Sequence, residues 1–305
     1  MNQYSHHKPV LVDEVIKSFE GVKLSVFLDG TLGAGGHAEA ILKAHPEIQS
    51  YIGIDQDIDA LQIAKKTLSS FREKCKFLQG NYKDAHEMIQ PLKANGILLD
   101  IGVSSMQLDQ GERGFSFQKK GFLDMRMDQS KKLTAEEVVN GFSEIKLGEI
   151  FRLYGEERHW KRAAKAIILA RRKKRIKTTE ELAGILKAEG IGKKKLHPAT
   201  LVFQALRIFV NDELGVLEEG LKPLGDCLEQ GGRMAVISFH SLEDRIVKNR
   251  FKEITRPLIP LDYREKKQPA KFRLIYKKPL VATREEMRDN PRSRSAKLRV
   301  VEKIK

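Results

Sequence analysis

The chain has 305 residues, of which 41 % are hydrophobic and 32 % are charged. This length suits two ordinary domains, or one large domain that carries an insertion. No apolar run approaches the roughly eighteen residues that a bilayer span requires, and no segment is of low complexity, which argues against a membrane-spanning or disordered protein. Residues 1–9 lack the apolar stretch of a secretion signal, and Cys75 and Cys227 are too few for a disulfide framework. We therefore expect a globular cytoplasmic protein.

Positive charge is concentrated in two stretches of the chain. The formal net charge is +15, and residues 245–305 alone hold 20 basic and 7 acidic residues, a net charge of +13. Residues 161–177 hold nine basic side chains and no acidic one. Such surfaces attract polyanions. Charge alone does not distinguish a nucleic-acid-binding protein from a merely basic one.

The first hundred residues alternate strand-like and helix-like segments. Short apolar runs that are typical of buried strands lie at residues 25–29, 51–55, 76–78 and 96–101. Helical patterns cover residues 38–44 and 58–68, with apolar side chains on one face. Continuous apolar strands separated by helices of this length predict a parallel sheet covered on both faces, which is a doubly wound α/β domain.

The pattern changes after residue 106. Residues 107–196 contain no convincing strand but show helical patterns at 135–139, 145–154, 160–174 and 179–188. A helix from Pro198 to Gly220 then resumes the covering layer, and residues 233–239 form a fifth strand. Strand-like pieces follow at 272–276 and 297–301. We predict a discontinuous α/β domain over 1–106 and 197–305, with an inserted, mainly helical domain over 107–196.

A glycine-rich turn, Asp29–His37, directly follows the first predicted strand and opens a helix. Glycines let the backbone approach a ligand closely, and a helix start supplies unpaired N–H donors. Asp55 ends the next strand, nineteen residues after Gly36, where an acid can bind both ribose hydroxyls of a nucleoside. This combination allows NAD or S-adenosylmethionine, and a purely structural turn is the simpler alternative.

The glycine spacing separates the two cofactors only in part. The turn contains Gly33-x-Gly35-Gly36, whereas the dinucleotide pattern is Gly-x-Gly-x-x-Gly. Acidic residues also end three successive strands, at Asp29, Asp55 and Asp100, which suits a cationic ligand without a pyrophosphate. For each of these acids the alternative is a cap for the turn or helix that follows.

The segment after the fourth strand lies where open α/β sheets place their active sites. This segment and eleven others recur in the order of one known protein family. The segments are His7–Leu11, Asp29–His37, Gly53–Asp55, Gly80–Tyr82, Asp100–Asp109, Arg113–Phe117, Leu123–Asp128, Tyr154–Arg158, His197–Thr200, Phe203–Ile208, Ile237–Lys248 and Asn290–Arg299. Over nearly its whole length the chain resembles the bacterial 16S ribosomal RNA cytosine-N4 methyltransferases. It departs from the family at Met106, where we expect Pro, and at Leu201, where we expect Arg or Lys.

The resemblance implies a class I, Rossmann-like methyltransferase fold that uses S-adenosylmethionine and releases S-adenosyl-L-homocysteine. The acceptor would be the exocyclic N4 of a cytidine in the decoding region (P site) of 16S ribosomal RNA, within the small ribosomal subunit. The resemblance implies that Gly35, Gly36 and His37 hold the methionine part of the cofactor and that Asp55 holds its ribose. The expected cofactor-binding residues are Gly33, Gly35, Gly36, His37, Asp55, Tyr82, Asp100 and Gln107.

The chemistry of amine methylation suggests the catalytic candidates. The lone pair of the cytosine amine is delocalised into the ring, so the enzyme must accept hydrogen bonds from the amine and aim it at the methyl group. Methylation at carbon 5 would need a thiolate, and neither cysteine lies in a motif. The candidate residues are Asp100, Ser104, Asp124 and His240, with Asp128 as a weaker choice. Asp124 and Asp128 could instead bond Arg126 or Arg113, and His240 could be a structural hydrogen-bonding residue.

RNA contacts are expected from the two basic stretches. The expected residues are Lys161, Arg171, Arg172, Lys173, Lys174, Arg175, Arg292 and Arg294. Phe115, Phe117, Phe122 or Tyr154 could stack on an extruded base, although aromatic side chains are more often core. The histidines lack metal-ligand spacing, so we expect no metal site.

Two other functions compete with this prediction. A DNA amine methyltransferase would usually carry an Asp/Asn/Ser-Pro-Pro-Tyr/Phe loop after the fourth strand, and Asp100-Ile101-Gly102-Val103 does not match it. A non-catalytic RNA-binding assembly factor would not need intact residues at Gly35, Gly36, Asp55 and Asp100.

Overall fold

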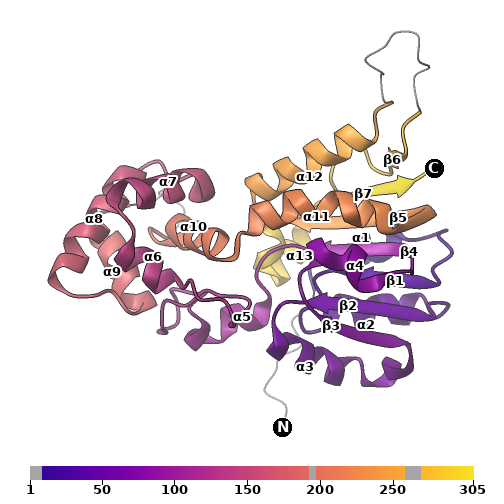
Figure 1. Ribbon diagram of the computed structural model, residues 1–305, viewed down its shortest axis with the longest axis horizontal. Coiled ribbons are helices and arrows are strands. Elements are labelled where there is room, and N and C mark those ends of the chain that lie inside the picture. Colours follow the sequence, from indigo (N-terminus) through magenta and orange to yellow (C-terminus); the bar gives the residue numbers. More distant parts are fainter. Residues whose placement is uncertain (1–8, 192–196, 258–268) are drawn as a thin grey trace. The chain divides into compact units, whose positions relative to one another are not determined.

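The computed structural model describes residues 9–191, 197–257 and 269–305 (Figure 1). The chain forms two compact units. The first comprises Met1–Gly102 and Leu214–Lys305, and the second comprises Val103–Glu213. Of the sequence motifs, His7 and Lys8 lie outside the described residues.

The first unit is built on a seven-stranded sheet of order β3-β2-β1-β4-β5-β7-β6. Its strands are β1 (Val26–Asp29), β2 (Ser50–Asp55), β3 (Cys75–Gln79), β4 (Ala94–Asp100), β5 (Leu228–Ser238), β6 (Phe272–Leu274) and β7 (Lys297–Lys303). The first five strands pair in parallel, and β7 is antiparallel to both β5 and β6. The predicted α/β fold of the Rossmann-like methyltransferase class is thus confirmed.

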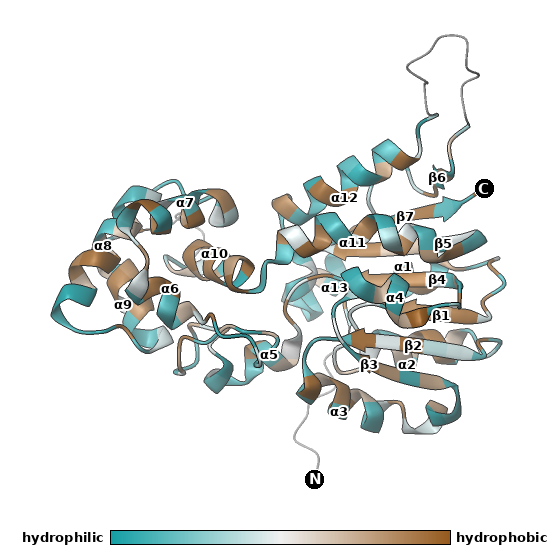
Figure 2. Cartoon of the chain, viewed as in Figure 1, coloured by the Kyte–Doolittle hydropathy of each residue, from teal (hydrophilic) through white to brown (hydrophobic). Residues whose placement is uncertain are grey.

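Helices cover both faces of the sheet. Successive residues of a strand point to opposite faces, and apolar strand residues on each face pack in a separate cluster. Phe27 belongs to one hydrophobic cluster and Leu28 to the other. One cluster packs the strands against α1 (Val12–Ser18), α2 (Gly36–Ala44), α3 (Ile58–Thr67) and α13 (Arg284–Asp289). The other packs them against α4 (Ala85–Ile89), α11 (Glu213–Cys227) and α12 (Ser241–Ile254). Figure 2 shows that α11 and α12 carry both hydrophobic and hydrophilic residues, as expected for helices with one buried face.

The strand order reverses between β1 and β4. From β1 the chain builds outward to β2 and β3, and then returns to place β4 on the other side of β1. Open α/β sheets bind their ligands at the carboxyl ends of the strands beside such a switch point. Asp29 and Asp100 end these two strands, so the fold itself indicates where the site lies.

The second unit is helical. Its helices are α5 (Ser105–Asp109), α6 (Ala135–Gly141), α7 (Glu144–Gly155), α8 (Trp160–Lys173), α9 (Thr179–Ala188) and α10 (Thr200–Asn211). Short 3-10 helices lie at Ser69–Lys74, Tyr82–Asp84 and Pro291–Ser295 in the first unit and at Gly111–Arg113 in the second. Capping boxes start α6 at Thr134 and α9 at Thr178, which explains why both begin where the sequence pattern predicts. In the described part of this unit, the one β feature is an isolated bridge between Phe122 and Thr178.

The boundaries of the units differ from the predicted ones at 106 and 197. The helix expected from Pro198 to Gly220 is two helices, because α10 ends at Asn211 and Asp212 adopts a left-handed conformation (φ 52°). The apolar face of α10, with Val202 and Leu206, packs in the core of the second unit and not against the sheet. The helical periodicity of residues 200–211 shows that one face of α10 is buried, but it does not show which of the two units this face packs in.

No helix in the described ranges has both the length and the hydropathy needed to cross a bilayer.

Candidate functional site

Asp29, the last residue of β1, holds the start of the glycine-rich turn through a hydrogen bond. The residue is 2 % exposed. Its Oδ1 accepts the N–H of Thr31 at 3.0 Å, and its Oδ2 accepts the hydroxyl of Tyr51 at 2.9 Å. Burial raises the pKa of Asp29 to about 6. Both oxygens are therefore committed to the fold, and Asp29 fixes the first step of the turn.

The turn needs its glycines for its backbone path. Gly33 (φ 54°) and Gly35 (φ 85°) lie in the left-handed region, which favours glycine. A Cβ at Gly36 would lie 2.7 Å from Cγ of Pro9, so only glycine leaves room for the N-terminal segment there. The helix α2 then starts at Gly36, behind an N-cap that has no side chain to satisfy its first amides.

Asp55 joins the turn to the end of β2. Its Oδ2 accepts the N–H of Gly33 at 2.7 Å, and its Oδ1 accepts the N–H of Asp57 at 2.9 Å. Burial raises the pKa of Asp55 to about 6, although these two hydrogen bonds favour the ionised form. The structure thus brings together the glycines and the acid that were expected to bind one nucleoside.

His37 and Asp100 meet at the carboxyl end of β4. The two atoms in contact are Nδ1 of His37 and Oδ2 of Asp100, at 3.4 Å. The other ring nitrogen, Nε2, lies 2.9 Å from the carbonyl oxygen of Val10. Because a carbonyl oxygen only accepts hydrogen bonds, Nε2 carries the proton in this arrangement. Burial lowers the pKa of His37, which favours the neutral ring.

Asp100 is the least satisfied acid of the site. Burial, and then the negative charge of Glu243, raises the pKa of Asp100 to about 7. Its Oδ1 is buried and has no hydrogen-bond partner among the described residues, while the side chain as a whole is 28 % exposed. A buried acceptor of this kind fits a hydrogen-bond donor or a cation supplied by a bound molecule.

Two further residues lie at or beside the glycine-rich turn. Thr31, within the turn, accepts the N–H of Asp100 through its hydroxyl at 2.6 Å and so ties the turn to β4. Tyr82 is buried, and a Cβ at Gly220 of α11 would lie 3.0 Å from its ring. Tyr82 is among the residues expected from the sequence, whereas Thr31 is not, although Thr31 lies inside the motif.

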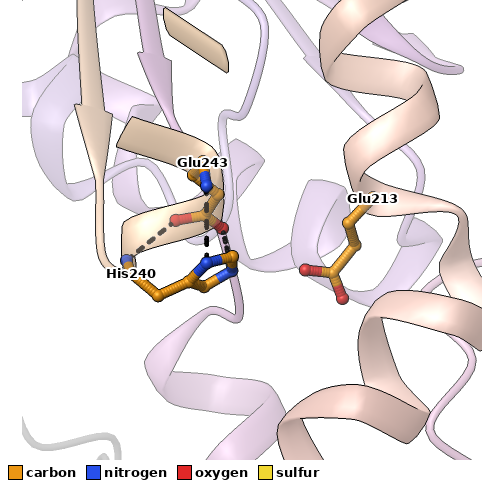
Figure 3. A group of neighbouring side chains, drawn as sticks. All are labelled: Glu213, His240 and Glu243. Carbon is orange, nitrogen blue, oxygen red and sulfur yellow. Dashed lines mark hydrogen bonds and ion pairs between the residues drawn. The ribbon is translucent and has the colours of Figure 1, made fainter. Parts of the chain in front are cut away.

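His240 has a structural role in this unit (Figure 3). It is the N-cap of α12, where Nδ1 accepts the N–H of Glu243 at 3.4 Å. Nε2 lies 3.0 Å from Oε1 of Glu243, whose Oε2 accepts the N–H groups of Phe239 and His240. The fully buried Glu243 carboxylate thereby caps the helix and supplies the charge that Asp100 experiences. Figure 3 also shows Glu213, which pairs with Arg207 in the second unit at 2.8 Å.

The remaining catalytic and cofactor candidates belong to the second unit. Ser104 and Gln107 form a capping box at the start of α5, each bonding the other's backbone N–H, at 3.1 and 3.2 Å. Arg126 donates to both oxygens of Asp124 at 2.7 Å. Burial opposes ionisation of Asp124, but the hydrogen bonds from Arg126 outweigh it and lower the pKa of Asp124. Asp128 bonds Ser130.

Several of the basic residues expected to bind RNA are engaged within the fold. Lys174 pairs with Glu181 at 2.8 Å, and Arg175 pairs with Glu136 at 2.7 Å. Arg171 donates to the carbonyl of Val139 at 2.7 Å. Lys161 lies 5.2 Å from the ring centroid of Trp160.

The other basic residues expected to bind RNA differ in their exposure to solvent. Arg172, Lys173 and Arg294 are exposed, and Arg292 is partly exposed. Neither Arg172 nor Lys173 forms an ion pair with any residue in the described ranges.

Three of the four aromatic candidates pack in the core of the second unit. Phe115 is buried, Phe117 stacks on His197 with ring centroids 4.4 Å apart, and Tyr154 packs against Phe209. Phe122 is 67 % exposed and is the candidate among the four that could stack on a base.

The raised pKa of Asp100 predicts a specific pH dependence of stability. The folded state holds this proton more tightly than the unfolded state, so its contribution to stability is lost as the pH rises from about 4 to about 7. Between pH 5 and pH 8 the melting temperature of Asp100→Asn should therefore fall less than that of the wild type, by a few degrees. Thermal unfolding by circular dichroism measures both, with Asp226→Asn, an exposed acid, as the control. Equal pH dependence in all three proteins would contradict the assignment.

Comparison with known proteins identifies the family of the chain. The model of the MraW methylase family matches residues 4–304. Ribosomal RNA small subunit methyltransferase H of Protochlamydia amoebophila is 52 % identical over 309 residues, which cover 98 % of this chain and 97 % of the relative. The protein of the same name from Persephonella marina is 45 % identical over 304 residues, covering 98 % and 99 %.

Similarity to solved structures is weaker. The crystal structure of an rRNA methylase from Streptococcus thermophilus covers 96 % of this chain and 94 % of its own, with 10 % identity and a TM-score of 0.44, and it supports no further conclusion. The sequence relationship is decisive instead. Because the family model matches nearly the whole length of the chain, the chain belongs to the MraW methylase family. The methyl donor of this family is S-adenosylmethionine.

Proposed function

We propose that this protein transfers a methyl group from S-adenosylmethionine to the exocyclic N4 of a cytidine in the decoding region, at the P site, of 16S ribosomal RNA. The observation that carries the proposal is the cluster of carboxyl groups around the glycine turn, above all the unsatisfied Asp100. The names of the relatives support ribosomal RNA of the small subunit as the substrate. The choice of N4 rests on the resemblance of the motifs.

The residues of the first unit fit the cofactor chemically. S-adenosylmethionine supplies an electrophilic methyl group on a positively charged sulfur. Partly desolvated carboxyl groups suit such a cation, because its charge compensates the cost of ionising them. We assign the methionine part to Gly33, Gly35, Gly36 and His37, and the ribose to Asp55. Tyr82, Asp100 and Gln107 would hold the rest.

Positioning would contribute most of the catalysis. In a single in-line displacement the bond between nitrogen and the methyl carbon forms as the bond between carbon and sulfur breaks, and the amine gives up one proton. The chain must hold the amine against the methyl group and accept its hydrogen bonds. Asp100 and the candidates Ser104 and Asp124 are acceptors of this kind.

Among these acceptors, Asp100 is best suited to take the proton. Burial raises its pKa to about 7, so it is a stronger base than an ordinary carboxylate. Asp124 is held by Arg126, which lowers the pKa of Asp124 and makes it a weaker base. His240 is occupied by the cap of α12, and we assign it a supporting role.

The reaction is tested by following the methyl group. Small-subunit ribosomal particles and duplex DNA are each incubated with the enzyme and tritiated S-adenosylmethionine, and the labelled nucleosides are identified by mass spectrometry. We expect label in the particles as N4-methylcytidine. Label in DNA would favour a DNA amine methyltransferase. Label on the ribose or on carbon 5 would contradict the proposed chemistry, and cofactor binding without transfer to either would favour an assembly factor.

If Asp55 binds the ribose, the variant Asp55→Ala should lose affinity for S-adenosylhomocysteine. The variant removes the proposed hydrogen-bond acceptor and the contact to the Gly33 N–H, so the dissociation constant for S-adenosylhomocysteine should rise by at least about tenfold. Isothermal titration calorimetry measures it. Glu73→Ala, which changes an exposed acid of the same unit, should bind as the wild type does. An unchanged affinity in Asp55→Ala would show that the ribose binds elsewhere.

If the exposed residues Arg172 and Lys173 contact RNA phosphates, reversing their charge should weaken the binding of RNA by this protein. In the double variant Arg172→Glu, Lys173→Glu the slope of log affinity against log salt should shrink by about 1 for each lost phosphate contact. Cofactor affinity should not change. The control is Lys23→Glu, Lys66→Glu, which alters the net charge equally on exposed residues of the first unit. If the two double variants behave alike, only the overall charge matters and the assigned surface is wrong.

A further inference from the structure

The segment Pro9–Leu11 lies directly on the cofactor turn. Pro9 packs so closely on Gly36 that a Cβ there would lie 2.7 Å from its Cγ. The carbonyl oxygen of Val10 accepts the Nε2 proton of His37 at 2.9 Å, and both residues are buried. The position of this one carbonyl decides which nitrogen of His37 carries the proton, and therefore whether Nδ1, which faces Asp100, is protonated.

Leu11 holds that carbonyl in place through an unusual backbone conformation. Its φ of 57° and ψ of 34° lie in the left-handed region, which residues with a Cβ seldom adopt unless the surrounding structure enforces it. Its side chain is fully buried, and its carbonyl oxygen accepts the N–H of Val15 at 2.9 Å. Its own N–H donates to Oε1 of Glu286 at 2.8 Å. Because this N–H belongs to the peptide unit that contains the Val10 carbonyl, the bond to Glu286 orients both groups at once.

Glu286 is itself firmly placed. It lies on α13, where Thr283 is the N-cap and its hydroxyl accepts the N–H of Glu286 at 3.1 Å. Just before this helix, Leu280 exchanges two hydrogen bonds of 2.9 Å with Leu298 of β7. The helix that carries Glu286 is therefore held next to β7 by hydrogen bonds, and this fixes where the side chain of Glu286 starts.

We propose that Glu286 is a positioning residue for the methyl-donor site: it fixes the peptide between Val10 and Leu11, which sets the tautomer of His37 and so whether Nδ1, the nitrogen that faces Asp100, carries a proton. The inference rests on the proposed function only in assigning His37 and Asp100 to the cofactor. Glu286 lies 275 residues from Leu11 in the chain, so the C-terminal segment is a working part of that site.

Other charged groups also face the two site residues. Asp29, Asp100 and Glu286 face His37, and Glu243 faces Asp100. A test must therefore separate the hydrogen bond of Glu286 from its charge. Glu286→Gln keeps an oxygen that can accept the Leu11 N–H but removes the charge. Glu286→Asp keeps the charge but shortens the side chain by one methylene, which withdraws the acceptor.

The first measurement is the tautomer of His37, read from nitrogen-15 chemical shifts of the labelled full-length protein without cofactor. We expect protonated Nε2 in the wild type and in Glu286→Gln, and a mixture with protonated Nδ1 in Glu286→Asp. The matched controls are Glu285→Gln and Glu285→Asp, which change the neighbouring exposed acid in the same helical turn and should retain the wild-type shifts. A purely structural role would alter stability but not this ratio of tautomers. Protonated Nδ1 in the wild type would overturn the proposal.

The second measurement is the affinity for S-adenosylhomocysteine by calorimetry. Glu286→Asp should bind on the order of tenfold more weakly, whereas Glu286→Gln and both Glu285 variants should stay within about twofold of the wild type. Equal losses in Glu286→Gln and Glu286→Asp, or no loss in either, would overturn the proposal. If the wild type bound no cofactor, the proposed function would fail, while the tautomer measurement would still decide the role of Glu286.

Discussion

The site depends on placing carboxyl groups where water cannot fully solvate them. Ionised groups are costly to bury unless hydrogen bonds or opposite charges replace the lost water. Asp29 receives a backbone N–H and the hydroxyl of Tyr51, and Asp55 receives two backbone N–H groups. Asp100 has the ring of His37 at 3.4 Å and an oxygen without a partner among the described residues. The fold thus gives both oxygens of two acids a hydrogen-bond donor and leaves one oxygen of the third, at the switch point of the sheet, without a partner among the described residues. A cation is the ligand that this arrangement favours electrostatically.

The parts of this site that follow local rules could be predicted from the sequence. Strands β1, β2 and β4 are continuous apolar runs, and their terminal acids necessarily meet at one edge of a parallel sheet. The contacts made by distant residues could not be predicted. Tyr51 resembles any other core aromatic in the sequence, and nothing marks its hydroxyl as the partner of Asp29. The bond from Leu11 to Glu286 joins the two ends of the chain, and no pattern of spacing connects them.

Charge and aromatic content proved less specific than the strand pattern, for a related reason. The sequence shows where basic residues are concentrated, but not which acids lie beside them after folding. Glu181 and Glu136 come from other helices and occupy Lys174 and Arg175. Similarly, Phe115 and Tyr154 serve the core of the second unit, while Phe122 is exposed. The boundary at α10 failed in the same way, since an apolar helix face does not reveal the core that will bury it.

Among the candidate proton acceptors, Asp124 and His240 are held by other residues of the fold. Asp124 is bonded through both oxygens by Arg126, and the ring of His240 is occupied by the helix cap of Glu243. Removing either from its present partner would leave a buried or partly buried charge uncompensated. Asp100 contacts His37 through Oδ2, but its Oδ1 has no partner among the described residues. Its raised pKa comes from burial and from Glu243, which the α12 cap keeps in place. The cap of α12 thus contributes to the raised pKa of Asp100, so we expect a variant at His240 that displaces Glu243 to change that pKa.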